Sequence, residues 1–332
     1  MADIPLVRAR YAHSFAKTLE NLGAPTGNLL GAHRLSPDLV ENQGGLITAH
    51  QLWSFAGSAA RREGLAHLGL LAGQLPVVEH GAFGKMVYEG ITLYDAIQTF
   101  CDNATMEYSR ADFYLTRDAE QALFCRGPID GEDAMQRQQV ELYVLVMMID
   151  TIRLGAGSQW QPRTLRLQTG DSAGLADVTL ISDADTCFGC SATAIGFPLS
   201  LLGKPLKGNI AIFTRPDNIS EDITTETDFG ESLRRVLKNY HGHTDLSLQN
   251  VAEITGLKQR TLQRRLKHAG LTFRDAVDQV RYELSLPLLH NRQHKLLDIA
   301  LELGYSDAAH FIRAFRRWCG LTPSEFRKQK AG

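Results

Sequence analysis

The sequence lacks the features that mark membrane-spanning, secreted and disulfide-rich proteins. Its longest apolar run, Leu142 to Ile149, falls well short of the ~18 apolar residues that a membrane-spanning helix needs, so no membrane span is expected. The first residues, MADIPLVRARYAH, contain no apolar signal-peptide core, which predicts a cytoplasmic protein. Five cysteines in 332 residues are too few for a disulfide framework, and reduced thiols are expected.

Catalytic signatures are missing as well. The chain has no G-x-S-x-G elbow, no H-E-x-x-H, no phosphate-binding loop and no G-x-G-x-x-G. Its carboxylates are plentiful but scattered, as on an ordinary protein surface. We therefore expect no catalytic residues, no metal and no cofactor, and no enzyme activity.

One pair of cysteines qualifies that expectation. Cys187 and Cys190 have the spacing of a redox pair or of half a zinc site. No nearby histidine or cysteine supplies the other half of a zinc site. An adventitious pair is favoured, and control by thiol redox state stays open.

The small net charge conceals a division along the chain. The whole sequence has 35 basic and 37 acidic residues, for a net charge of −2. Residues 230–332 hold 18 basic and 10 acidic residues, a net +8, which leaves a net −10 for residues 1–229. This asymmetry indicates either a nucleic-acid partner for the basic part or a solvated charged surface.

A helix-turn-helix pattern opens the basic part, from Leu246 to Gly270. Ser247 is a suitable N-cap for its first helix. Gly256 falls where a tight turn needs a positive φ. In the helix that follows, Leu262 and Leu266 lie four residues apart and are expected to face the core.

The pattern recurs from Leu296 to Arg327. Ile299 and Gly304 repeat the valine and glycine of the first unit 48 residues later, and Phe311 and Phe315 repeat its two leucines after 49 residues. The second turn is therefore one residue longer. Two copies of one unit in a basic region are much stronger evidence for DNA binding than one copy.

These segments resemble the DNA-binding end of the AraC/XylS family of bacterial transcription regulators. The string ALELGYSDAAHFIRAFRRWCGLTPSEFR is similar to the family's C-terminal signature, and VAEITGLKQRTLQRRLKHAGLTFRD to the unit before it. The resemblance implies an all-α domain over residues 230–330, with two helix-turn-helix units joined by a linker helix. It also implies binding to a double-stranded DNA operator with tandem half-sites, and activation through RNA polymerase, with repression as the alternative.

The DNA contacts follow from the resemblance and from base chemistry, because arginine pairs with guanine and glutamine with adenine in the major groove. The residues predicted to read bases are Arg260, Thr261, Gln263 and Arg264 in the first unit, and Ala309, His310, Ile312 and Arg313 in the second. The predicted phosphate contacts are Arg265, Lys267, Arg316 and Arg317. Since the second set has few hydrogen-bonding groups, the first unit is expected to carry most of the sequence specificity.

The linker helix is expected from Phe273 to about Leu289. Pro287 departs from the family pattern there, because an interior proline costs about 3 kcal/mol or more and removes a donor. The sequence favours a helix that ends near Ser285, with a kink as the alternative.

Residues 1–215 are predicted to form an α+β domain, followed by a linker over residues 216–229. Helices are expected at Pro5–Leu22, Thr48–Arg62, Thr92–Tyr108 and Gln136–Leu154, a flexible turn at Gly81–Gly84, a hairpin at 111–116 and 121–126, and strands at 164–168 and 193–197.

The same part resembles the sensor domain of the ornithine-utilisation type of AraC-family regulators. The similar strings are RLSPDLVENQGGLITAHQLWSFAGSAARREG, HGAFGKMVYEGITLYDAIQTFCDNATM and CFGCSATAIGFPLSLLGKPL. The resemblance implies a domain that senses a small-molecule effector and forms a homodimer. It identifies no effector, and control by a protein partner stays open.

Aromatic residues near turns or element ends are candidates for the effector pocket. These residues are Trp53, Phe83, Tyr88, Tyr94 and Phe197. Aromatic side chains of this kind also form ordinary cores, which is the alternative for each of them.

Overall fold

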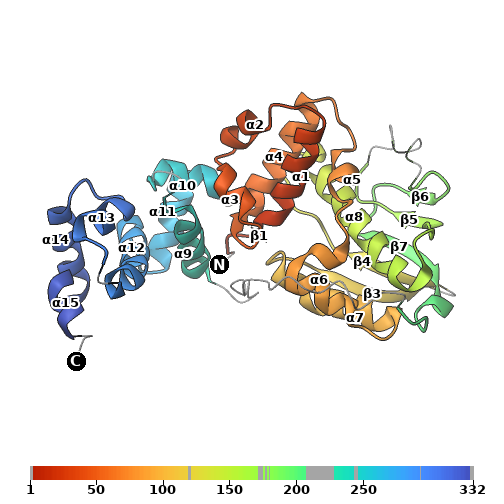
Figure 1. The fold of residues 1–332 in the computed structure, drawn as a ribbon. Coiled ribbons are helices and arrows are strands. Elements are labelled where there is room, and N and C mark those ends of the chain that lie inside the picture. The colour runs from red at the N-terminus through yellow and green to blue at the C-terminus, as the bar shows by residue number, and fades with distance from the viewer. Residues whose placement is uncertain are drawn as a thin grey trace. The chain divides into compact units, whose positions relative to one another are not determined.

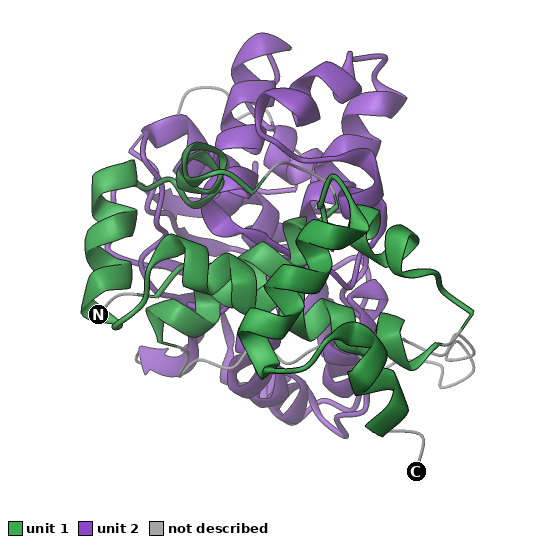
Figure 2. Ribbon diagram, turned by 90° about the vertical axis from the view of Figure 1, so that its left-hand side faces the viewer, with its two compact units in different colours: residues 1–4, 226–332 green, residues 5–225 purple. Residues whose placement is uncertain are grey.

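The structure, a computed structural model, describes residues 3–118, 121–170, 175, 178, 180–206, 228–242, 246–291 and 293–329. The chain divides into two compact units, residues 5–225 and residues 226–332 together with residues 1–4 (Figure 2). Positions 216–227 of the predicted linker lie outside the described residues. The predicted fold class, an α+β domain followed by an all-α domain, is confirmed (Figure 1).

Residues 5–225 contain helices, short 3₁₀ turns and strands. The helices are α1 (Ala9–Asn21), α2 (Thr26–Ala32), α3 (Pro37–Glu41), α4 (Ala49–Arg62), α5 (Leu68–Ala72), α6 (Gly81–Tyr88), α7 (Leu93–Asn103) and α8 (Ala134–Ala156). The 3₁₀ turns are η1 (Val77–Glu79), η2 (Ala104–Met106) and η3 (Leu199–Leu201). The strands are β1 (Leu6–Arg8), β2 (Leu46–Thr48), β3 (Phe113–Asp118), β4 (Gln121–Arg126), β5 (Thr164–Arg166), β6 (Asp185–Cys187) and β7 (Thr193–Pro198).

The strands form two sheets. β1 and β2 make an antiparallel pair, and the larger sheet has the order β3-β4-β7-β5-β6. Its strands pair antiparallel except for β5 with β6. The hairpin predicted from sequence is confirmed, with Phe113 opposite Arg126 and Asp118 opposite Gln121.

Helix α8 is the centre of this unit. Leu142, Tyr143, Met147 and Met148 are all at most 4% exposed, and they lie on different sides of the helix. A helix that is apolar on most of its surface must be covered on several sides, and α8 packs against α4, α5, α7 and β7. In the described part of the chain, no helix combines the length and apolar character that a bilayer crossing requires.

Two sequence predictions for this unit are wrong. The helix expected from Pro5 begins only at Ala9, because Leu6–Arg8 pair with Leu46–Thr48 as a strand. The turn expected at Gly81–Gly84 is the first turn of α6. A Cβ on Gly84 would lie 1.9 Å from the carbonyl oxygen of Val77, so this glycine permits a close backbone approach to η1.

After position 227, the described secondary-structure elements of the second unit are all helices. Its helices are α9 (Phe229–Tyr240), α10 (Leu248–Thr255), α11 (Gln259–His268), α12 (Phe273–His290), α13 (Leu296–Glu302), α14 (Ala308–Cys319) and α15 (Pro323–Gln329). One apolar cluster joins the end of α12 to α13 and α14 through Leu289, Ile299, Phe311 and Phe315.

The expected end of the linker helix near Ser285 is wrong, because α12 continues through Pro287 to His290. Pro287 itself is exposed, whereas Leu289 is 1% exposed and packs in the apolar cluster of α13 and α14. Burial of a leucine contributes about 1.5–3 kcal/mol, which offsets much of the cost of the interior proline.

Candidate functional site

The first helix-turn-helix unit forms as its sequence predicts. The hydroxyl of Ser247 accepts a hydrogen bond from the backbone N–H of Asn250 at 3.2 Å and caps α10. Gly256 has a φ of 67° and ends that helix. Leu262 and Leu266 of α11 are buried, which fixes the opposite face of α11 toward solvent.

That solvent face of α11 carries the predicted base-reading residues. Arg260, Gln263 and Arg264 are exposed, and Thr261 is half-buried. Within the described residues, the three exposed side chains make no hydrogen bond or ion pair to the protein. Their donors are therefore available for base edges or phosphates.

The corresponding face of α14 in the second unit offers fewer hydrogen-bonding groups than α11. Gly304 has a φ of 76°, and the side chain of Asp307 caps α14 by accepting from the backbone N–H of His310 at 2.8 Å. The same carboxylate contacts the imidazole Nδ1 of His310 at 2.5 Å, which holds the ring against the helix start. This hydrogen bonding lowers the pKa of Asp307, and it leaves Arg313 as the strongest free donor on this face. Ala309 is exposed and Ile312 half-buried.

The four predicted phosphate contacts differ in their surroundings. Lys267 and Arg316 are exposed. Arg265 is half-buried, with its guanidinium carbon 5.5 Å from the centre of the Phe229 ring. Arg317 donates from Nη2 to the Asp278 carboxylate of α12 at 2.6 Å. Arg265 and Arg317 thus have structural partners within the domain.

Sequence reasoning missed two arginines of α12. Arg274 and Arg281 line a hollow of about 710 Å³ together with Arg313 and Arg317 of α14. Arg281 lies over the Tyr305 ring, with its guanidinium carbon 4.9 Å from the ring centre. The sequence could have indicated this pair, because Arg274 and Arg281 are seven positions apart and residues at that spacing lie on one face of a helix.

Two of the five predicted effector residues line a small cavity. Trp53 and Phe83 line a cavity of about 50 Å³ between buried residues of 5–225. Tyr88 is half-buried at the end of α6, Tyr94 is 48% exposed, and Phe197 is buried on β7. The latter three residues are not part of the lining of that cavity.

The small cavity is bordered by buried polar groups. Glu107 contacts the Arg10 guanidinium at 3.4 Å, and burial raises the pKa of its carboxyl to about 7. His80 does not line the cavity, but it is fully buried near Arg10, and burial lowers the pKa of its imidazole to about 3. The indole N–H of Trp53 has no hydrogen-bond partner among the described residues. A volume of about 50 Å³ holds one or two water molecules, which would satisfy such groups.

The two cysteines singled out from sequence lie at the end of β6. The sulfur atoms of Cys187 and Cys190 are 3.3 Å apart, and Cys187 is exposed. Among the described residues, no cluster of three or more metal-ligating side chains is present.

Comparison with known proteins identifies the family. A profile described as the N-terminal arabinose-binding domain of AraC transcription regulators matches residues 23–206, and a helix-turn-helix profile matches residues 251–329. The ornithine utilization regulator of Pseudomonas aeruginosa is 25% identical over an alignment of 350 positions, gaps included, that covers 97% of this chain and 96% of that protein. The regulator VqsM of the same species is 42% identical over 81 residues, 24% of this chain and 25% of VqsM. The activator RhaS of an Enterobacter species is 35% identical over 89 residues, 26% of this chain and 32% of RhaS.

These matches agree with the geometry of the two helix-turn-helix units. The first profile alone spans more than half of the sequence, and the second covers both units. The chain belongs to the AraC family of DNA-binding transcription regulators.

Proposed function

We propose that this regulator is a transcriptional activator that reads its operator mainly through α11 and responds to a small-molecule effector bound in its N-terminal unit. The observation that carries the proposal is the exposed face of α11, where Arg260, Gln263 and Arg264 offer donors that no other described residue uses. Arginine pairs with guanine and glutamine with adenine in the major groove, so this face suits base recognition.

The second unit is proposed to add affinity more than specificity. Its exposed face offers Arg313, while His310 is engaged by Asp307. Arg274 and Arg281 of α12 lie beside α14, where Asp278 offsets part of their charge, and the exposed Arg274 is suited to a phosphate. Two such units would occupy tandem half-sites about one helical turn apart.

Homodimerisation, contact with RNA polymerase and a cytoplasmic location complete the proposal. They rest on the family resemblance and on the names of relatives such as the activator RhaS. A reporter gene behind the bound promoter distinguishes activation, where deletion of the regulator lowers expression, from repression, where deletion raises it.

Genome-wide mapping of bound DNA tests the function directly. The proposal predicts a set of sites that share a sequence with two half-sites, and loss of those sites when Gln263 and Arg264 are both replaced by alanine. An unchanged set of sites in the double variant would contradict the assignment of α11 as the reading helix.

Thiol redox control is a second candidate, favoured by one observation. The sulfur atoms of Cys187 and Cys190 lie 3.3 Å apart and Cys187 is exposed, so little movement would bring them to bonding distance. Titration of free thiols with and without oxidant, followed by DNA-binding measurements, tests it. An unchanged DNA affinity after oxidation would eliminate this candidate.

A further inference from the structure

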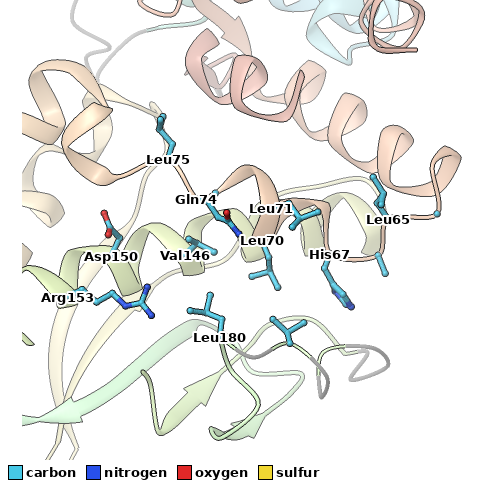
Figure 3. Close-up of a pocket in the computed structure, with 14 residues that line it drawn as sticks. Leu65, His67, Leu70, Leu71, Gln74, Leu75, Val146, Asp150, Arg153 and Leu180 are labelled. Atoms are coloured by element: carbon cyan, nitrogen blue, oxygen red, sulfur yellow. The ribbon is translucent and has the colours of Figure 1, made fainter. Parts of the chain in front are cut away.

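A second pocket of residues 5–225 has the size of a small-molecule site. Its volume is about 700 Å³, whereas the aromatic cavity around Trp53 holds about 50 Å³. Sites for small ligands usually have volumes of roughly 300–1,000 Å³. The pocket lies between α5, the segment that follows α5, and α8, with Leu180 on a further wall (Figure 3).

The walls of this pocket are mainly aliphatic. Leu70 and Leu71 of α5 and Val146 of α8 contribute to them, and Figure 3 shows Leu70 and Leu180 directed into the same space. Leu71 is 42% exposed, so part of its side chain is accessible to a ligand. A sugar needs many hydrogen-bonding partners, so these walls suit the apolar body of a ligand better than a carbohydrate.

Arg153 supplies the positive charge among the described residues that line the pocket. Arg153 of α8 donates from Nε to the carbonyl oxygen of Trp160 at 2.9 Å, and this bond fixes the guanidinium. Its two Nη groups make no hydrogen bond or ion pair within the described residues. A held guanidinium with a free pair of N–H groups matches the two oxygens of a carboxylate.

Asp150, one turn before Arg153 on α8, limits the charge of the ligand. Its Oδ2 accepts a hydrogen bond from the backbone N–H of Val77 at 2.7 Å, so the carboxylate is fixed at the edge of the pocket. Asp150 also interacts electrostatically with Arg153 and offsets part of its positive charge. A ligand with two negative charges would therefore be repelled, because like charges at close range are unfavourable in a partly buried site. The pocket therefore favours a monoanion over a phosphate or a dicarboxylate.

We propose that this pocket binds the effector, and that the effector is a small monocarboxylate with an aliphatic body. Arg153 pairs with the carboxylate, and Leu70, Leu71 and Leu180 contact the aliphatic part. The proposal rests on the proposed function, since it takes residues 5–225 to be the sensing unit. It uses none of the five aromatic residues predicted from sequence, so the two assignments are distinguishable.

Thermal unfolding and calorimetry of the full chain with straight-chain carboxylates from butanoate to decanoate test the proposal. Alcohols and amines of matching chain length, and arabinose, are the comparison ligands. We expect the carboxylates alone to raise the unfolding temperature in a dose-dependent way, because a ligand that binds the folded state stabilises it. Equal stabilisation by the amines, or none by any carboxylate, would overturn the proposal.

Arg153→Met removes the charge and retains much of the volume. We expect at least a tenfold loss of carboxylate affinity in Arg153→Met, and no loss in the matched control Arg62→Met, which changes an exposed arginine outside the pocket. Leu71→Asn is a second variant, chosen because Leu71 is exposed and its replacement should leave the folded core intact. It should reduce the affinity for the longer carboxylates most. Binding that survives Arg153→Met but is lost in Trp53→Phe would overturn the proposal.

DNA binding of the same proteins separates this inference from the proposed function. A chain that binds operator DNA but no carboxylate refutes the pocket assignment alone. A chain that binds carboxylates through Arg153 but no specific DNA refutes the proposed function and leaves the pocket assignment intact.

Discussion

Replacing Pro287 by alanine tests how α12 accommodates a residue that normally ends helices. Pro287 has no N–H, so the carbonyl of Glu283 one turn earlier receives no hydrogen bond from this position. An interior proline costs about 3 kcal/mol relative to alanine, part of which is offset because proline also restricts the unfolded chain. Pro287 is exposed, so its replacement removes little packing. We expect Pro287→Ala to raise the free energy of unfolding of this unit by about 1–3 kcal/mol.

Hydrogen exchange of peptides that cover α12 measures this effect locally. A gain of about 1–3 kcal/mol corresponds to exchange that is about 5- to 150-fold slower. The control Leu289→Ala truncates a side chain that is 1% exposed and should destabilise the unit by about 2–5 kcal/mol. Exchange in Pro287→Ala that is as fast as in the natural protein would refute the reasoning.

Two further predictions concern the core of residues 5–225. Burial raises the pKa of Glu107 from 4.5 to about 7, so between these pH values the folded state retains a proton that the unfolded chain releases. The free energy of unfolding therefore falls as the pH rises from 4.5 to about 7, by up to about 1.4 kcal/mol per pH unit. Urea unfolding across the same window should show this slope in the natural protein and a flatter one in Glu107→Gln; equal slopes would contradict the assignment. Gly84→Ala places a Cβ 1.9 Å from the Val77 carbonyl oxygen and should cost about 1–3 kcal/mol, whereas Gly31→Ala on α2 meets nothing within 4 Å and should stabilise by about 0.5–1 kcal/mol. Chemical denaturation compares the two variants, and a Gly84→Ala protein of natural stability would disprove the close approach.

Local signals in the sequence were sufficient to predict much of the structure of the DNA-binding unit. Ser247 caps α10 and Gly256 takes a positive φ because both effects act within one turn of backbone. The exposed face of α11 follows from Leu262 and Leu266, which fix the opposite face in the core.

Features set by tertiary contacts were not predictable in the same way. β1 forms because its residues pair with β2, about forty positions along the chain, and α6 depends on the approach of Gly84 to Val77. The contact of Arg317 with Asp278 likewise joins residues 39 positions apart. The sequence did not single out Arg153 as a site residue, because only the fold brings it to the same pocket as the leucines of α5.

The most direct test of the account is base discrimination by single variants on the mapped operator. Fluorescence anisotropy would measure affinity for the operator and for each single base-pair substitution. The account predicts that Gln263→Ala and Arg264→Ala each lose about 1–3 kcal/mol of discrimination at one base pair, while Lys267→Ala weakens all sequences alike. Greater loss of discrimination in His310→Ala and Arg313→Ala than in the α11 variants would contradict the claim that α11 reads the operator.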